Sequence, residues 1–195
     1  WSSDVCSSDL PLAEQSNLIH AIGEWVFRRV CADFAAWRTA EAAPKRVAIN
    51  LSLRQFGRPG TVERIAEILK EHNVAPSVIE LEITESTLME YERSGPVLES
   101  LAALGFRIAI DDFGTGYSSL AALRQMPVQT LKIDQSFVHR LTEDGDNATL
   151  TRTIVELGRN LGLEVVAEGI ETAEQRQLLA LQGCHLGQGR LLARR

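Results

Sequence analysis

The chain has 195 residues, of which 45% are hydrophobic and 24% are charged, and its formal net charge is −6. This length and hydrophobic content allow one sizeable core, and no stretch rich in proline, glycine or serine divides the chain. The acidic balance, without a basic patch that carries interleaved aromatic residues, argues against a nucleic-acid polymer as partner.

The cysteines and the hydropathy pattern indicate where such a chain works. Cys6, Cys31 and Cys184 are odd in number and widely spaced, which is typical of a reducing cytoplasm rather than of a disulfide scaffold. The sequence has no uninterrupted apolar run long enough to predict a membrane span. We therefore expect a cytoplasmic domain, although other domains of a parent protein can supply a membrane anchor.

The first predicted elements are an irregular start and a long helix. Residues 1–10 repeat Ser-Ser-Asp and lack apolar periodicity, so we interpret them as a non-native or assembly-derived segment and leave them out of the fold. A genuine divergent start is the alternative. Residues 18–40 predict an amphipathic helix with Trp25, Val26, Val30 and Phe34 at helical spacing, and we expect this stripe to pack on the same domain.

Short apolar, β-branched runs follow, and each ends on a residue that can bind a metal or move a proton. The runs are Val47–Ile49 before Asn50, Ile79–Leu81 before Glu82, Phe106–Ile110 before Asp111, Thr130–Leu131 before Lys132, and Val165–Ala167 before Glu168.

Helix-like sequence lies between these runs. Pro96 suits the first turn of one helix and Gly105 the position after its end, while Thr172 and Gln175 form a capping box for another. Residues 143–147 predict a polar loop. The predicted helices are 61–71, 96–104, 119–124, 150–161 and 173–181.

Alternation of apolar strands with helices predicts a parallel sheet covered by helices, either an open doubly wound sheet or a closed barrel. An open sheet gathers ligands at one switch point, whereas polar residues here end nearly every strand. We therefore expect an α/β fold of the TIM-like (β/α)8 barrel type, in which all strand ends ring one mouth.

The pair Asp111-Asp112 opens the glycine-rich stretch Phe113-Gly114-Thr115-Gly116. Neighbouring side chains at a strand end point in different directions, so two carboxylates can reach two cations or one cation and its water. A mononuclear or binuclear Mg²⁺ or Mn²⁺ site is one interpretation. Asx-type turn hydrogen bonds are the other, and these residues alone leave both open.

Five motifs in order carry a resemblance. They are Ala48-Ile49-Asn50-Leu51-Ser52, Leu81-Glu82-Ile83-Thr84-Glu85, Asp111 to Leu120, Leu131-Lys132-Ile133-Asp134, and Ala167-Glu168-Gly169-Ile170-Glu171-Thr172. With them the chain resembles an EAL domain, the cyclic di-GMP phosphodiesterase family, from Pro11 to Arg194.

The resemblance implies hydrolysis of cyclic di-GMP to the linear dinucleotide with Mg²⁺ or Mn²⁺ and an activated water. Two ions are expected in the complete domain. The matching positions imply that Asn50, Glu82 and Asp111 bind the first metal, that Asp111 and Asp112 bind the second, and that Lys132 orients the attacking water. They also imply that Glu168 is a general base or water ligand, that Glu85 fixes the loop after Asp111, and that Glu171 and Gln188 support the site or contact substrate.

Departures from the family pattern bear on activity. The Glu-Ala-Leu signature, whose glutamate binds the first metal in the family, does not occur in this sequence. We therefore expect a partial EAL domain over residues 11–195 that lacks the first two strands and the final helix of the barrel. Arg190 replaces a usual aromatic residue and Arg195 a usual proline. An active parent and a nearly inactive chain are the expected combination.

Other functions stay open. A catalytically silent cyclic di-GMP sensor or a protein-interaction module is the main alternative, and a magnesium-dependent lyase is a weaker one. Glu171 also suits a purely structural role at a helix N-terminus. The resemblance further implies a homodimer through residues 115–120 and flanking sensory or GGDEF domains in the parent.

Overall fold

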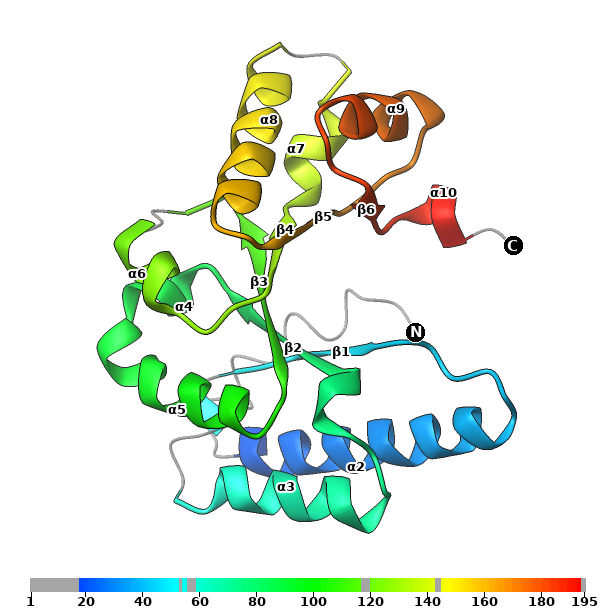
Figure 1. Cartoon of the computed structure of the whole chain (residues 1–195), viewed down its shortest axis with the longest axis vertical. Helices are drawn as coiled ribbons and strands as arrows, with labels where there is room; N and C mark the ends of the chain where they lie inside the picture. Colours follow the sequence, from blue (N-terminus) through cyan, green and yellow to red (C-terminus); the bar gives the residue numbers. More distant parts are fainter. Residues whose placement is uncertain (1–17, 53, 56–58, 117–119, 143–144, 194–195) are drawn as a thin grey trace. The chain divides into compact units, whose positions relative to one another are not determined.

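The computed structural model describes residues 18–52, 54–55, 59–116, 120–142 and 145–193 (Figure 1). Residues 1–10, interpreted above as non-native, therefore lie outside the described part. The chain divides into two compact units. Unit 1 comprises Trp1–Leu81 and Glu99–Arg107, and unit 2 comprises Glu82–Leu98 and Ile108–Arg195.

The strands form one six-stranded sheet in chain order. The pairings β3 with β4, β4 with β5 and β5 with β6 are all parallel. The strands are β1 (Val47–Asn50), β2 (Ile79–Thr84), β3 (Arg107–Phe113), β4 (Thr130–Ile133), β5 (Glu164–Ala167) and β6 (Leu186–Gly187). The predicted parallel α/β class is confirmed, and every apolar run identified above is a strand.

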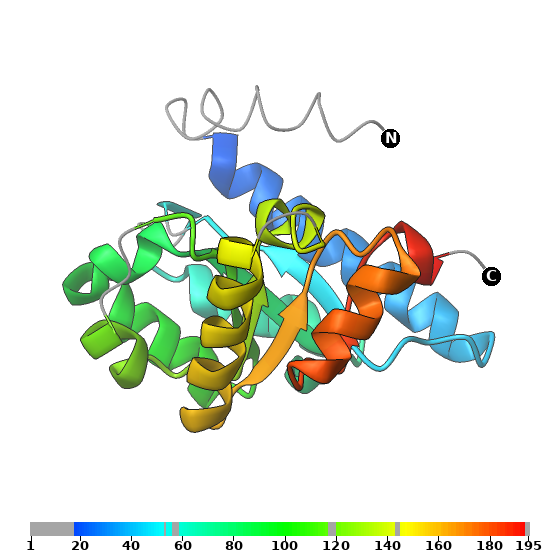
Figure 2. The ribbon, with the colours of Figure 1, turned by 90° about the horizontal axis from the view of Figure 1, so that it is seen from above.

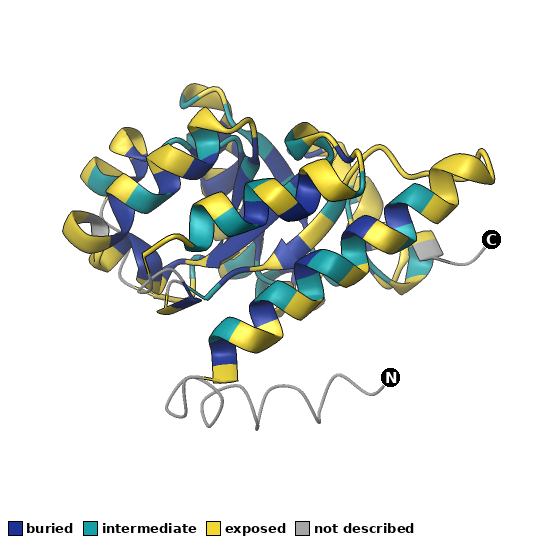
Figure 3. Cartoon of the chain, turned by 90° about the horizontal axis from the view of Figure 1, so that it is seen from below, coloured by how far each residue is buried: buried dark blue, intermediate teal, exposed yellow. Residues whose placement is uncertain are grey.

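In unit 1, α2 (Leu18–Thr39) packs against α3 (Thr61–Glu71), and η2 (Pro76–Val78) leads into β2. The buried residues recur along one side of α2 (Figure 3). They are Ile19, Gly23, Phe27, Cys31 and Phe34. The ring of Phe27 meets that of Phe106 edge to face at 6.3 Å between centroids.

The predicted stripe of α2 was partly wrong. Phe34 is buried, but Trp25 is 62% exposed and Val26 and Val30 are only half-buried. Gly23 lies on the buried face, where an added Cβ would be 3.0 Å from Cδ of Gln55, so the Gln55 side chain would have to shift to admit a larger residue.

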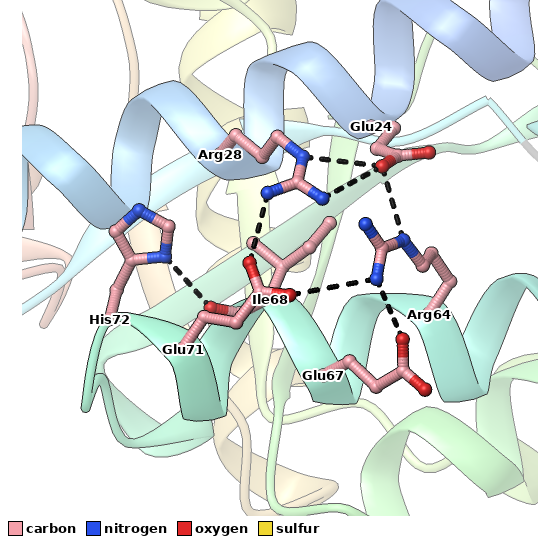
Figure 4. A network of polar contacts seen from close by, with 7 residues as sticks. All are labelled: Glu24, Arg28, Arg64, Glu67, Ile68, Glu71 and His72. Carbon is pink, nitrogen blue, oxygen red and sulfur yellow. Dashed lines mark hydrogen bonds and ion pairs between the residues drawn. The ribbon is translucent and has the colours of Figure 1, made fainter.

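The exposed sides of α2 and α3 are joined by ion pairs (Figure 4). The Glu24 carboxylate accepts from Arg28 at 3.1 Å and from Arg64 at 3.1 Å, and Arg28 also donates to Glu71 at 2.9 Å. These contacts lower the pKa of Glu24, first through Arg28, against the opposing effect of burial. The network links the two helices at their solvent side.

Unit 2 contains most of the remaining helices, and α8 packs against β4 and β5 (Figure 2). The core here is formed by fully buried strand residues such as Ile108, Ile110, Leu131 and Ile133. The helices are α4 (Ser86–Met89), α6 (Leu120–Gln125), α7 (Gln135–His139), α8 (Gly145–Asn160), α9 (Ala173–Leu181) and α10 (Arg190–Ala193), while α5 (Tyr91–Ala103) contributes to both units.

Helix ends show where sequence rules succeed and fail. The capping box is confirmed, because Thr172 Oγ1 accepts from Gln175 N at 3.2 Å and Gln175 Oε1 accepts from Thr172 N at 3.0 Å. Pro96 was placed wrongly in a first turn, since α5 begins at Tyr91 and holds Pro96 in its interior. The Ser94 hydroxyl, which donates to Glu90 O at 3.0 Å, supports this earlier turn.

The polar loop predicted for residues 143–147 was also wrong in part. Gly145 opens α8, so residues 145–147 form its first turn, and Asp146 there suits the positive end of the helix dipole. Residues 143–144 lie outside the described part. In the described ranges no helix is long and apolar enough to cross a membrane.

Candidate metal centre

The acidic pair sits on an irregularity of β3. Ile110 pairs with Leu131 and Phe113 with Ile133, so three steps along β3 match two along β4. Asp112 has φ of 54°, in the left-handed region, which identifies a β-bulge. The sequence placed the end of this strand before Asp111, whereas β3 continues through Phe113. The bulge re-aims the carboxylates that a regular strand would send to opposite faces.

The loop after the bulge is held by a buried carboxylate. Glu85, only 4% exposed, accepts through Oε2 from Gly114 N at 2.9 Å and from Gly116 N at 3.1 Å. Gly114 has φ of 101°, and a Cβ there would lie 2.9 Å from a ring carbon of Phe137. Hydrogen bonds to Glu85 and close packing against Phe137 therefore hold residues 114–116 in place.

Lys132 is the centre of the site. Its Nζ lies 2.6 Å from Glu82, 2.9 Å from Asp111 and 2.6 Å from Glu168, and its side chain is 6% exposed. These residues come from β2, β3, β4 and the end of β5, and β4 and β5 are in register with Lys132 opposite Val166. Parallel strands thus bring residues far apart in sequence to one edge.

The charges do not balance within this group. Three carboxylates meet one ammonium, and burial raises the pKa of Glu82, partly opposed by Lys132. Burial alone would lower the pKa of Lys132, but its hydrogen bonds to Glu168, Glu82 and Asp111 raise it above the ordinary value. Burial therefore favours the neutral form of the Glu82 carboxyl, while the surrounding carboxylates favour the charged form of Lys132. The group as a whole carries excess negative charge.

A cation fits this excess. One oxygen each of Asp111, Asp112 and Glu168 lie within 4.8 Å of one another. Burial, followed by the negative charges of Asp111 and Asp134, raises the pKa of Asp112 to about 6. Hard carboxylate oxygens suit divalent cations such as Mg²⁺ or Mn²⁺, so the donor set of these residues matches the predicted type of cofactor.

Asp134 is a neighbour that the sequence analysis did not select. It caps α7, where its Oδ1 accepts from Ser136 N at 2.9 Å and from the Ser136 hydroxyl. The Asp134 carboxylate also contributes to the raised pKa of Asp112. Its spacing gave a signal, because Asp134 stands two residues after Lys132 and alternate strand residues share a face.

The other predicted site residues lie in different places. Asn50 ends β1 in unit 1 and is exposed. Gln188 and Glu171 are exposed residues just beyond β6 and β5 in unit 2. Glu171 N donates to Gln175 Oε1 at 2.8 Å, and its carboxylate lies 3.7 Å from Arg190.

Comparison with known proteins gives a family match and several relatives. The EAL domain model matches residues 7–195. The bifunctional diguanylate cyclase/cyclic di-GMP phosphodiesterase MucR of Pseudomonas aeruginosa is 46% identical over 186 residues, which are 95% of this chain and 27% of MucR. The cyclic di-GMP phosphodiesterase NbdA of the same species is 39% identical over 184 residues, which are 94% of this chain and 24% of NbdA.

Solved structures agree with these relatives. A PaMucR phosphodiesterase in complex with c-di-GMP has a TM-score of 0.89 at 45% identity, over 96% of this chain and 76% of that one. The EAL domain of Mycobacterium smegmatis DcpA has a TM-score of 0.80 at 40% identity, over 88% of this chain and 78% of that one. The predicted TIM-like class is confirmed. The chain spans about a quarter of the length of the curated relatives named here.

Proposed function

Because this chain belongs to the EAL domain family, we propose that its unit 2 site serves the hydrolysis of cyclic di-GMP to linear pGpG. The observation that carries this proposal is the convergence of Glu82, Asp111 and Glu168 on the buried Lys132. The relatives MucR and NbdA are named as cyclic di-GMP phosphodiesterases. Their similarity over nearly all of this chain supports the same substrate.

The metal ligands in this proposal are Asp111 and Asp112, with Glu82 as the family resemblance implies and Glu168 near by. Asn50, which lies in unit 1, stays a prediction from the resemblance. Mg²⁺ or Mn²⁺ are the proposed ions. A bound divalent cation supplies Lewis-acid polarisation of a phosphoryl oxygen and lowers the pKa of its water. The excess of carboxylates over ammonium groups provides the electrostatic drive for such binding.

Glu168 and Lys132 have complementary roles in the proposal. The Glu168 side chain is 20% exposed, so its carboxylate can meet water and accept a proton. Lys132 holds the Glu168 oxygen at 2.6 Å, and its positive charge opposes the negative charge that develops on the phosphate. Glu85 acts on position alone, by holding the loop after Asp112.

The sequence contains no Glu-Ala-Leu motif, and a first metal shell with one ligand fewer would bind its cation more weakly. A domain that binds cyclic di-GMP without hydrolysis is therefore the second candidate.

The test measures production of pGpG from cyclic di-GMP with Mg²⁺ or Mn²⁺. The chain is compared with a version whose N-terminal extension supplies the family segment that carries Glu-Ala-Leu. Hydrolysis by the extended version, abolished by Glu168→Gln and unaffected by Glu174→Gln on the exposed start of α9, is expected. Binding without hydrolysis in both versions would favour the second candidate, and absence of binding by folded protein would refute both.

Dimerisation through residues 115–120 is a further part of the proposal. Residues 117–119 lie outside the described part, and the adjacent Leu120 is 56% exposed. Light scattering of the extended version tests it, and a monomer with and without ligand would contradict it.

A further inference from the structure

The segments that follow β5 and β6 are tied together next to Glu168. Gln188 N donates to Ala167 O at 2.8 Å, Ile170 N to Gln188 O at 3.1 Å, and Leu191 N to Ile170 O at 3.1 Å. These bonds continue the contact of β5 with β6 past the ends of both strands. They hold the backbone on each side of Glu171 and Arg190 in one place.

Glu171 and Arg190 form an open pair at this position. Arg190 Nη1 lies 3.7 Å from Glu171 Oε1, and the two side chains are 86% and 44% exposed. An ion pair this long and this exposed contributes little to stability. Both groups can therefore exchange their mutual contact for a ligand, while the backbone that carries them stays fixed.

The two groups together match the adjoining Hoogsteen and Watson–Crick edges of one nucleobase. Guanine presents two acceptors, N7 and O6, next to two donors, N1–H and N2–H. A guanidinium donates to N7 and O6, and a carboxylate accepts from N1–H and N2–H. Adenine differs where the two edges meet. It has an N6 amino donor in place of the O6 acceptor, and an unprotonated N1 in place of N1–H.

We propose that Arg190 and Glu171 bind a guanine of the dinucleotide and select it against adenine. The inference rests on the proposed function, since it assumes that a guanine nucleotide lies at Glu168. The family resemblance places an aromatic residue where this chain has Arg190. An aromatic side chain stacks on any base, whereas a guanidinium beside a carboxylate distinguishes bases by their hydrogen-bonding groups.

The test measures the dissociation constants of cyclic di-GMP and cyclic di-AMP by isothermal titration calorimetry, with EDTA present so that hydrolysis does not consume the ligand. The variants are Arg190→Ala, Glu171→Gln and the control Arg152→Ala, an exposed position on α8. Circular dichroism establishes that each variant is folded.

We expect Arg190→Ala and Glu171→Gln each to weaken cyclic di-GMP binding by about tenfold and cyclic di-AMP binding by less than about twofold, so that guanine preference falls. Arg152→Ala should change neither. Equal weakening for both dinucleotides would overturn the inference in favour of a phosphate contact, and an unchanged Arg190→Ala would overturn it outright. If the folded wild-type chain binds no cyclic di-GMP, the proposed function fails and this inference with it.

Discussion

Replacing Lys132 by methionine tests whether the buried ammonium holds the acidic site together. Methionine has a similar length and no charge. In the variant, Glu82, Asp111 and Glu168 would keep their places around a side chain that cannot donate to any of them. Since Lys132 is only 6% exposed, water cannot easily take over the role of its ammonium group.

The size of the effect follows from the geometry. Oxygens of Asp111 and Glu168 lie within 4.8 Å of each other, and two like charges at that separation repel by roughly 3 kcal/mol at an effective dielectric constant of about 20. Breaking a buried ion pair by removing one partner costs about 3–5 kcal/mol. We expect Lys132→Met to lower the free energy of unfolding by an amount in that range.

Urea unfolding followed by circular dichroism, in EDTA at pH 8, measures this loss. Lys70→Met, at an exposed position of α3, is the control and should change stability by less than about 0.5 kcal/mol. Mn²⁺ should restore more stability to Lys132→Met than it adds to the wild type, because the cation replaces the lost charge.

Adding Glu82→Gln to Lys132→Met should recover part of the loss. A Lys132→Met variant as stable as the wild type in EDTA would refute the reasoning, because the carboxylates would then not depend on the ammonium.

Three further predictions concern other parts of the chain. Gly114→Ala should lower the free energy of unfolding by about 2–4 kcal/mol in urea titrations, because it combines positive φ with a contact of 2.9 Å, whereas Gly60→Ala, with positive φ and nothing within 4 Å, should cost only about 1 kcal/mol. Glu24→Gln should destabilise by less than about 1 kcal/mol at pH 7. Since the folded-state pKa of Glu24 is lowered, this difference should shrink as the pH falls below the ordinary carboxyl pKa of 4.5 and vanish below the folded-state pKa, and a constant difference from pH 7 to pH 3 would contradict it. Cys31, with 0% exposure and a pKa raised to about 11, should resist iodoacetamide at pH 8, as read by peptide mass spectrometry, until urea unfolds the chain.

Sequence periodicity and capping chemistry were enough to locate most elements. The helices α3 and α9 have the predicted bounds 61–71 and 173–181, because each has a helical apolar period and α9 also has a capping box at its start. The positions of the strands were predictable from their apolar runs, but β2, β3 and β4 continue past Glu82, Asp111 and Lys132, the polar residues expected to end them.

Two features were not predicted correctly from the sequence: the buried face of α2 and the start of α5. The apolar period of α2 does not say which side is buried, and Trp25 was assigned to the core only because it is large and apolar. The side that is buried carries Ile19, Gly23, Phe27, Cys31 and Phe34. Pro96 was taken as a start because it commonly occupies a first turn, yet α5 begins upstream of it.

The candidate site was also predictable only in part. The order of the motifs predicted which residues meet, because parallel strands end at one edge. It did not predict that Lys132 contacts three carboxylates at once, nor that Asp134 stands beside Asp112. Both depend on side-chain packing after the strands have paired.

The bulge at Asp112 has a consequence for stability that can be separated from its role in binding. Its carboxyl has a pKa raised to about 6, first by burial and then by Asp111 and Asp134. A raised folded-state pKa means that the ionised form is less favourable in the fold, so the penalty is present above pH 6 and absent below about pH 4.

Asp112→Asn keeps a residue that tolerates positive φ and removes the charge. In EDTA at pH 8 we expect the variant to be more stable than the wild type by about 1 kcal/mol, a small value because solvent screens an exposed carboxyl. At pH 4 the two should be equally stable, while Mn²⁺ should stabilise the wild type more than the variant at pH 8. Equal stability at pH 8 without metal would contradict this prediction, because the ionised Asp112 carboxylate would then not destabilise the fold. The charge and positive φ at the bulge would in that case be no argument for a bound ligand.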